Sequence, residues 1–139
     1  MSRFVLDASV ALAWVAGAPV DSYAVSVQSS VTSGWRAIVP SLWLLEVANG
    51  LLMIERRKSL TAVDADRGLL DLERFLAASA DVDQSPSPLR QLADLARTYQ
   101  LTVYDAAYLE LAKRESLPLA TLDKSLRAAA AKAGVALLK

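Results

Sequence analysis

The chain has 139 residues and no net charge; 54% of its residues are hydrophobic and 22% are charged. These proportions exclude a disordered chain and predict one folded domain over residues 1–139. The absence of cysteine and histidine excludes disulfides, thiolate metal sites and catalysis of the Ser-His-Asp or Cys-His type. An enzyme built from this sequence has carboxylates as its natural metal ligands, and carboxylates suit Mg²⁺ or Mn²⁺.

The first part of the chain alternates short apolar runs with helical patterns. The predicted elements, in order, are a strand at 3–6, helices at 8–15 and 21–31, and a strand at 36–39. Arg3 and the apolar stretch after Asp7 loosely resemble a signal peptide, but the charge between them favours a strand and a helix. No other run is long and apolar enough to span a membrane, and the lack of cysteine agrees with a reducing cytoplasm, where we expect the protein to act.

The rest of the chain keeps this alternation. The predicted elements are helices at 40–57 and 61–77, a strand at 81–84, helices at 85–99 and 104–114, a strand at 117–122, a helix at 124–133 and a strand at 135–138. Apolar residues lie on nearly every side of the helix at 40–57, which predicts burial on most sides. The whole pattern predicts an α/β fold, with a mostly parallel sheet of four to five short strands flanked by helices.

Three aspartates occupy positions where the chain enters a helix. Asp7 follows the first strand, Asp123 follows the strand at 117–122, and Asp105 lies in the first turn of its helix. Ligands of parallel sheets gather at the carboxyl ends of the strands. Each residue alone is better explained by helix capping, and Thr102 completes a capping-box pattern with Asp105.

Glu46 is harder to explain by local structure, because it lies inside an apolar helix. The residues three and four positions away are Leu42, Trp43, Asn49 and Gly50. None of these is a cation, and burying a carboxylate without a partner costs several kcal/mol. A metal ion or a distant cation would account for Glu46; the alternative is a glutamate at a solvent-exposed edge. Asn49, one turn further on the same face, could hold the carboxylate or a bound water.

Several carboxylates in one place repel one another, and a divalent cation cancels that repulsion. Such an ion can lower the pKa of a bound water and stabilise charge on a phosphoryl oxygen, so phosphodiester hydrolysis is the favoured reaction class. Four segments of the sequence point the same way: Val5–Ser9, Pro40–Asn49, Leu101–Tyr108 and Leu119–Asp123. In this order and spacing they resemble the PIN-domain family, and most of all the VapC toxins of bacterial type II toxin–antitoxin pairs.

The resemblance implies a PIN-like endoribonuclease that depends on Mg²⁺ or Mn²⁺ and hydrolyses RNA as a toxin. It also implies a homodimer, and a cognate antitoxin that inhibits by occupying the active-site groove. The family's acidic quartet, both catalytic and metal-binding, falls on Asp7, Glu46, Asp105 and Asp123. Supporting positions, which bond to ligands or water, fall on Ser9, Asn49 and Thr121. Capping and turn formation compete with this interpretation for Ser9 and Thr121.

Two other interpretations stay open. A receiver-like phospho-signalling domain is also α/β and acidic at its strand ends. It would need a second acid beside the first, whereas Asp7 is followed by Ala8 and Glu46 falls in a helix. A catalytically silent PIN scaffold is the other alternative.

The sequence does not decide the role of two further groups of side chains. Apolar side chains at 69–76, together with the helix that carries Glu46, could bind the antitoxin or a second copy, or could belong to the core; they are Leu69, Leu70, Leu72, Phe75 and Leu76. Basic clusters at 56–58, 113–114 and 124–127 could contact RNA or could be solvated helix faces.

Overall fold

The computed structural model describes residues 2–85 and 88–139, in which short strands alternate with helices. The elements are β1 (Arg3–Leu6), α1 (Ala8–Val15), α2 (Ser22–Thr32), β2 (Arg36–Val39), α3 (Leu42–Arg56), α4 (Ala62–Ser79), β3 (Ala80–Val82), α5 (Leu89–Tyr99), α6 (Val103–Glu115), β4 (Leu119–Ala120) and α7 (Lys124–Ala133). The predicted α/β fold is confirmed.

The four strands form one parallel sheet in the order β3-β2-β1-β4. In β1 and β2 only the first residue is partly exposed, as expected of central strands covered on both faces. The chain places β2 and β3 on one side of β1 and then returns to place β4 on the other side. The direction of strand order therefore reverses next to β1.

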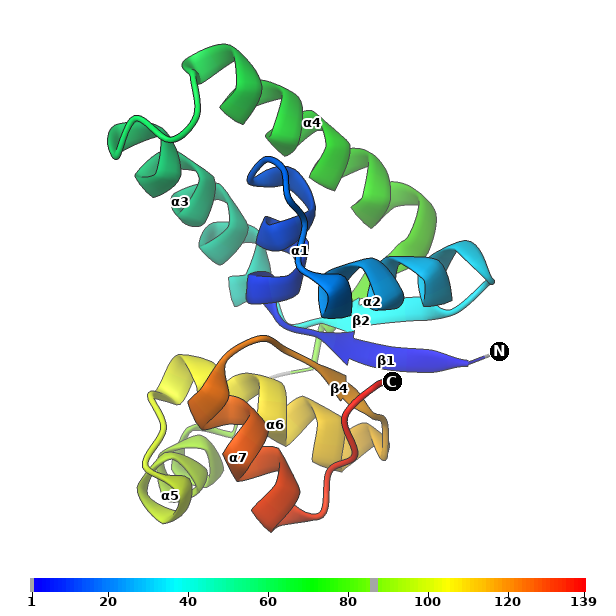
Figure 1. Ribbon diagram of the computed structural model, residues 1–139. Coiled ribbons are helices and arrows are strands. Elements are labelled where there is room, and N and C mark those ends of the chain that lie inside the picture. The colour runs from blue at the N-terminus through cyan, green and yellow to red at the C-terminus, as the bar shows by residue number, and fades with distance from the viewer. Residues whose placement is uncertain (1, 86–87) are drawn as a thin grey trace.

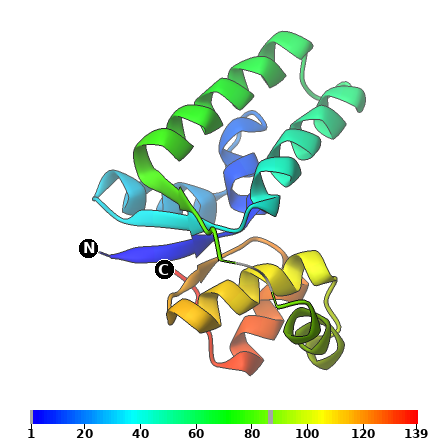
Figure 2. The same ribbon diagram turned by 180° about the vertical axis from the view of Figure 1, so that it is seen from behind.

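Helices cover both faces of this sheet. Figure 1 shows α1 to α4 on one side and α5 to α7 on the other, and Figure 2 shows the same two layers from behind. α3 and α4 form an antiparallel pair, and α1 packs against both. Gly50 of α3 permits this close approach, because a Cβ at this position would lie 2.4 Å from Cδ1 of Leu12. On the other side, α6 packs against β1 and lies between α5 and α7.

Capping side chains begin several of the helices where the sequence predicts them. Oδ1 of Asp21 accepts hydrogen bonds from the backbone N–H groups of the first turn of α2, at 2.8 and 3.2 Å. Oγ1 of Thr61 accepts one from Asp64 N at 3.1 Å and so caps α4. At the other end of the chain Gly134 closes α7 with a φ of 77°, which a glycine adopts without strain.

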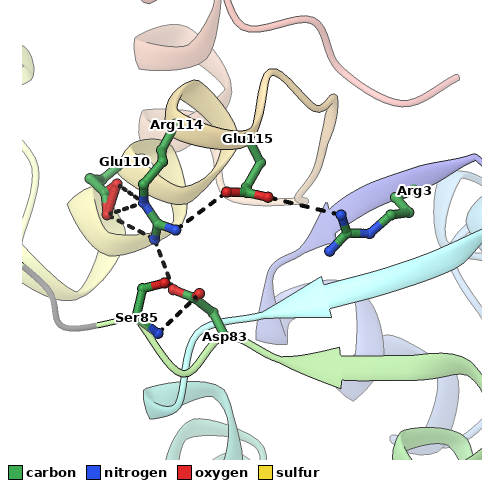
Figure 3. Close-up of polar contacts among 6 residues, drawn as sticks. All are labelled: Arg3, Asp83, Ser85, Glu110, Arg114 and Glu115. Carbon is green, nitrogen blue, oxygen red and sulfur yellow. Dashed lines mark hydrogen bonds and ion pairs between the residues drawn. The ribbon is translucent and has the colours of Figure 1, made fainter.

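A cluster of ion pairs joins α6 to the segment after β3 (Figure 3). Arg114 donates to Glu110 Oε2 at 2.9 Å and to Asp83 Oδ2 at 2.8 Å. The side chain of Glu110 is only 3% exposed, so Arg114 supplies the charge that makes its burial tolerable. Glu115 contacts Arg114 as well, and lies 3.9 Å from Arg3 of β1. The cluster therefore ties α6 to β1 and to the segment after β3.

Three predicted strands are shorter than the sequence suggested. β3 ends at Val82 rather than at residue 84, and β4 contains only Leu119 and Ala120 instead of 117–122. Pro118 has no N–H group, which limits the ladder on the amino-terminal side of β4. The predicted strand at 135–138 contributes only a single bridge, between Leu119 and Leu137. In the predicted helix at 85–99, residues 86 and 87 lie outside the described part of the chain, and α5 begins at residue 89.

The prediction that α3 is buried on most sides is wrong for one side. The exposed apolar strip of α3, as we call it, consists of Leu44, Leu45, Leu52 and Met53, which are 42%, 76%, 41% and 36% exposed. Periodicity counts apolar side chains, but it does not say which other element covers them.

The apolar side chains of α4 belong mostly to the core. Leu72 is buried, and Leu69, Phe75 and Leu76 pack against the core, whereas Leu70 is 44% exposed. Within residues 2–85 and 88–139, no helix is both long and apolar enough to cross a membrane.

Candidate active site

The direction of strand order reverses between β1 and β4. Open α/β sheets bind ligands beyond the carboxyl ends of the strands at such a switch point, and we call this place the crevice. Asp7 follows β1 directly, and Thr121 to Asp123 follow β4. The two segments meet there, because Asp7 N donates to the carbonyl oxygen of Ala120 at 2.9 Å. The sheet therefore brings two of the predicted acids to one place, although 116 residues separate them in the sequence.

Asp7 is 5% exposed and is held by two hydroxyl groups. Ser9 Oγ and Thr121 Oγ1 both donate to its Oδ2, at 2.6 and 2.7 Å. No side chain among the described residues donates to its Oδ1. Asp7 stands at the N-cap position of α1, but its side chain makes no capping hydrogen bond. Helix capping, the simplest explanation from sequence, therefore does not account for this carboxylate.

Ser9 and Thr121 support both sides of the crevice. Thr121 is fully buried, and its Oγ1 also accepts a hydrogen bond from Asp123 N at 3.0 Å. Ser9 Oγ accepts one from Leu122 N at 3.0 Å and so links α1 to the loop after β4. Their contacts thus fit the supporting role that the family resemblance implies.

Asp123 keeps part of its capping role. Its Oδ2 accepts a hydrogen bond from Leu126 N at 2.9 Å and caps α7. Its Oδ1 receives no hydrogen bond from the described residues. Arg127, one turn further along α7, donates to the carbonyl oxygen of Thr121 at 2.7 Å and lies over the ring of Tyr23 at 4.8 Å. Arg127 therefore braces the loop after β4 without pairing with Asp123.

Glu46 and Asp105 come from opposite sides of the sheet, on α3 and α6 (Figure 1). Glu46 is partly buried, and its Oε1 accepts a short hydrogen bond from the buried hydroxyl of Tyr108. Asp105 lies in the first turn of α6, where its N–H donates to Thr102 Oγ1 at 3.1 Å, as the capping pattern predicts. The Asp105 carboxylate takes no part in that hydrogen bond.

The four acids affect one another electrostatically. Burial raises the pKa of Asp7, and the charge of Asp123 adds to the increase, while the Ser9 and Thr121 hydroxyls oppose it. Burial likewise raises the pKa of Glu46; the Tyr108 hydrogen bond opposes this, and the charges of Asp7 and Asp105 reinforce it. Because the charge of one acid raises the pKa of another, these carboxylates lie close enough to repel one another.

The pKa of Asp105 is raised in the same way, first by burial and then by the charges of Asp123 and Asp7. Among the described residues, no Lys or Arg forms an ion pair with any member of the acidic quartet. The described part of the chain also contains no three acidic side chains spaced so as to hold one ion together. The acidic quartet is thus a group of negative charges that no described cation neutralises. In this conformation fewer than three of the four acids could bind the same ion directly.

Not every predicted residue joins the site. Asn49 is exposed on α3, and no hydrogen bond connects its side chain to Glu46 in the described structure. Conversely, Tyr108 ends one of the four matching segments, and the sequence alone gives it no role in the site. The signal that could have found it is its spacing, because it lies three residues after Asp105 and therefore on the same side of α6.

Comparison with known proteins agrees with the fold. Several solved structures match the chain, including two crystal structures. The crystal structure of PAE2754 from Pyrobaculum aerophilum is 27% identical, with a TM-score of 0.67, and the match covers 92% of this chain and 84% of that one. The crystal structure of FitAcB from Neisseria gonorrhoeae is 18% identical, with a TM-score of 0.63 and coverage of 98% and 96%, and at that identity it supports the fold alone. No curated protein matches the sequence.

The sequence also matches the family model described as PIN domain, over residues 4–132. PIN domains are generally nucleases and typically use divalent metal ions. The match spans nearly the whole chain, and the all-parallel sheet agrees with it. The resemblance inferred from four short motifs is therefore confirmed: this chain belongs to the PIN-domain family.

Proposed function

We propose that this protein is a metal-dependent endoribonuclease and the toxin of a toxin–antitoxin pair. The observation that carries the proposal is the acidic quartet at the switch point of the sheet. The pKa values of Asp7, Glu46 and Asp105 are raised, and no described Lys or Arg forms an ion pair with any of the four acids. The family supplies the reaction class. RNA as substrate and an antitoxin as inhibitor rest on the resemblance to VapC toxins.

The side chains present fit Mg²⁺ or Mn²⁺. Both ions prefer hard oxygen ligands, and each of the four acids has an oxygen to which no described side chain donates a hydrogen bond. Mg²⁺ usually keeps several of its waters and is bound through one or two carboxylates. The absence of a three-acid cage from the described residues is therefore compatible with an ion held partly through water. Asp7, Glu46, Asp105 and Asp123 are the residues that would hold it, directly or through water.

The reaction is hydrolysis, in which water attacks phosphorus and one P–O bond of the RNA backbone breaks. A divalent ion in this site supplies a water of lowered pKa and stabilises the charge that develops on the phosphoryl oxygen. Ser9 and Thr121 hold Asp7 at one side of the crevice. Burial excludes water from most of the Asp7 side chain, which strengthens its electrostatic interactions.

The test is cleavage of RNA by the purified protein with Mg²⁺ or Mn²⁺, with and without a chelator. We expect cleavage that stops when the metal is removed. Asp7→Asn is expected to abolish it and to relieve growth arrest in cells, whereas Asp66→Asn, at an exposed aspartate of α4, is expected to change neither. Full RNA cleavage by Asp7→Asn would contradict the proposed function. A folded protein that binds no Mn²⁺ would favour the catalytically silent scaffold. The receiver-like alternative has no support from the family match.

We also propose that a second copy of the chain covers the exposed apolar strip of α3. The strip lies on the helix that carries Glu46, and Leu45, its most exposed member at 76%, directly precedes that residue. Covering it removes apolar surface from water, which favours association. A dimer formed there would place the second copy beside the acidic quartet.

A further inference from the structure

The hydroxyl of Tyr108 lies between two layers of the molecule. Tyr108 belongs to α6, on one side of the sheet, and Glu46 belongs to α3, on the other (Figures 1 and 2). The hydrogen bond from Tyr108 Oη to Glu46 Oε1 therefore crosses from one helical layer to the other. Asp105 is one helical turn before Tyr108, so the same helix supplies one acid of the quartet and a hydroxyl bound to another.

Packing alone explains the ring of Tyr108 but not its hydroxyl. The side chain is fully buried, and its neighbours in α6, Ala107 and Leu109, are buried apolar residues. A phenylalanine would fill the same space. The one side-chain partner of the hydroxyl among the described residues is Glu46, and the bond uses Oε1 only. Oε2 is left without a side-chain donor.

We propose that Tyr108 is a positioning residue, whose hydroxyl holds the Glu46 carboxylate on the side of α3 that faces Asp7 and Asp105. This inference rests on the proposed function. A glutamate side chain has three rotatable bonds, and an exposed face of α3 lies beside it. Without the hydroxyl, Glu46 gains rotamers that point to solvent, away from the other acids, and repulsion from the quartet favours those rotamers.

The test is Tyr108→Phe, which keeps the ring and removes only the donor. The matched control is Tyr99→Phe, at a partly buried tyrosine that packs against the core from the end of α5 and makes no hydroxyl hydrogen bond in the described structure. Mn²⁺ affinity is measured by calorimetric titration of each variant, together with thermal unfolding without metal. Hydrogen-bond partners of metal ligands typically contribute about 10–100-fold to metal affinity. We expect Tyr108→Phe to weaken Mn²⁺ binding by about 10-fold or more, and Tyr99→Phe to leave it unchanged.

A double-mutant cycle separates positioning from packing. In a Glu46→Gln background, the carboxylate that Tyr108 holds is gone, so Tyr108→Phe is expected to cause no further loss of Mn²⁺ affinity. In RNA cleavage at saturating metal, Tyr108→Phe is expected to lower kcat and to leave KM unchanged. An equal loss in the Glu46→Gln background, or no loss in the wild-type background, would overturn the proposal and leave the proposed function intact. A wild-type protein that binds no Mn²⁺ and cuts no RNA would overturn both.

Discussion

Replacing Asp7 by Asn should stabilise the metal-free protein although it destroys the proposed site. The carboxylate is 5% exposed and carries a charge that no described cation neutralises. Burying such a charge costs several kcal/mol, and the two hydroxyl donors return about 3 kcal/mol. Asn removes the charge and keeps one acceptor oxygen for Ser9 and Thr121. The expected net gain is about 1–2 kcal/mol at neutral pH.

Thermal unfolding monitored by circular dichroism measures this effect. For a chain of 139 residues, 1 kcal/mol corresponds to about 3–4 °C in Tm, so Asp7→Asn should raise Tm by about 3–7 °C without metal. The control Asp66→Asn should change Tm by less than about 2 °C. With Mn²⁺ at 100 times its Kd the wild type should gain about 2.7 kcal/mol, which reverses the order of the two proteins. An Asp7→Asn variant that is no more stable than the wild type without metal would refute the reasoning.

Three further predictions concern charge and surface. Arg114→Met leaves Glu110 buried and unpaired. Because Arg114 itself is 31% exposed, we expect the free energy of unfolding to fall by about 2–3 kcal/mol. Arg97→Met, at an exposed pair, should lower it by less than about 0.5 kcal/mol, and urea unfolding measures both values. Without metal, the raised pKa values of Asp7, Glu46 and Asp105 mean that the folded state binds more protons than the unfolded state above the ordinary values of 3.8 and 4.5. Stability should therefore fall as pH rises through the folded pKa values, and saturating Mn²⁺ should abolish that fall; a Tm that rises steadily to pH 7 without metal would contradict this. If the proposed dimer forms through the exposed apolar strip of α3, Leu45→Glu should convert it to a monomer in light-scattering measurements, whereas Val63→Glu, at an exposed position of α4, should not. A wild type that is monomeric at every concentration would rule out the proposed dimer.

The loss of folding stability at acid pH has a different cause from the loss toward neutral pH. Burial alone would raise the pKa of Asp83, but the hydrogen bonds from Arg114 and Ser85 and the charge of Arg114 outweigh it and hold the pKa below 3.8. A group with a lowered folded pKa contributes stability that is lost as pH falls through that pKa. Asp83, in the ion-pair cluster of Figure 3, and Asp81, whose pKa is lowered by Arg36, thus contribute to the loss of stability at acid pH. Asp7, Glu46 and Asp105 act in the opposite direction, toward neutral pH.

Most of the fold could be predicted from local pattern. The strands at 3–6 and 36–39 are continuous apolar runs, and the helices that begin after Asp21 and Thr61 carry their own capping signals. The strand at 117–122 was overestimated, because an apolar run reports burial and not pairing. The exposed strip of α3 was missed for a related reason: what covers an apolar face depends on tertiary packing.

The candidate site could be predicted only in part. The sequence suggested that Asp7 is a helix cap, yet its carboxylate is held by Ser9 and Thr121, and Thr121 lies 114 residues away in the sequence. No local pattern predicts a contact of that range. The sequence shows that Glu46 lacks a cation within its own helix, but its hydrogen-bond partner, Tyr108, lies in another layer of the fold. The family motifs supplied the candidate residues, and the strand topology supplies the reason that they lie near one another.

The most direct test of the central claim is a crystal structure of the protein soaked in Mn²⁺, with data collected at the manganese absorption edge. The account predicts an anomalous peak in the crevice beyond β1 and β4, within coordination distance of at least one oxygen of the acidic quartet and lost in Asp7→Asn crystals. A crevice without a peak at saturating Mn²⁺, or a peak only at other surface carboxylates, would contradict it.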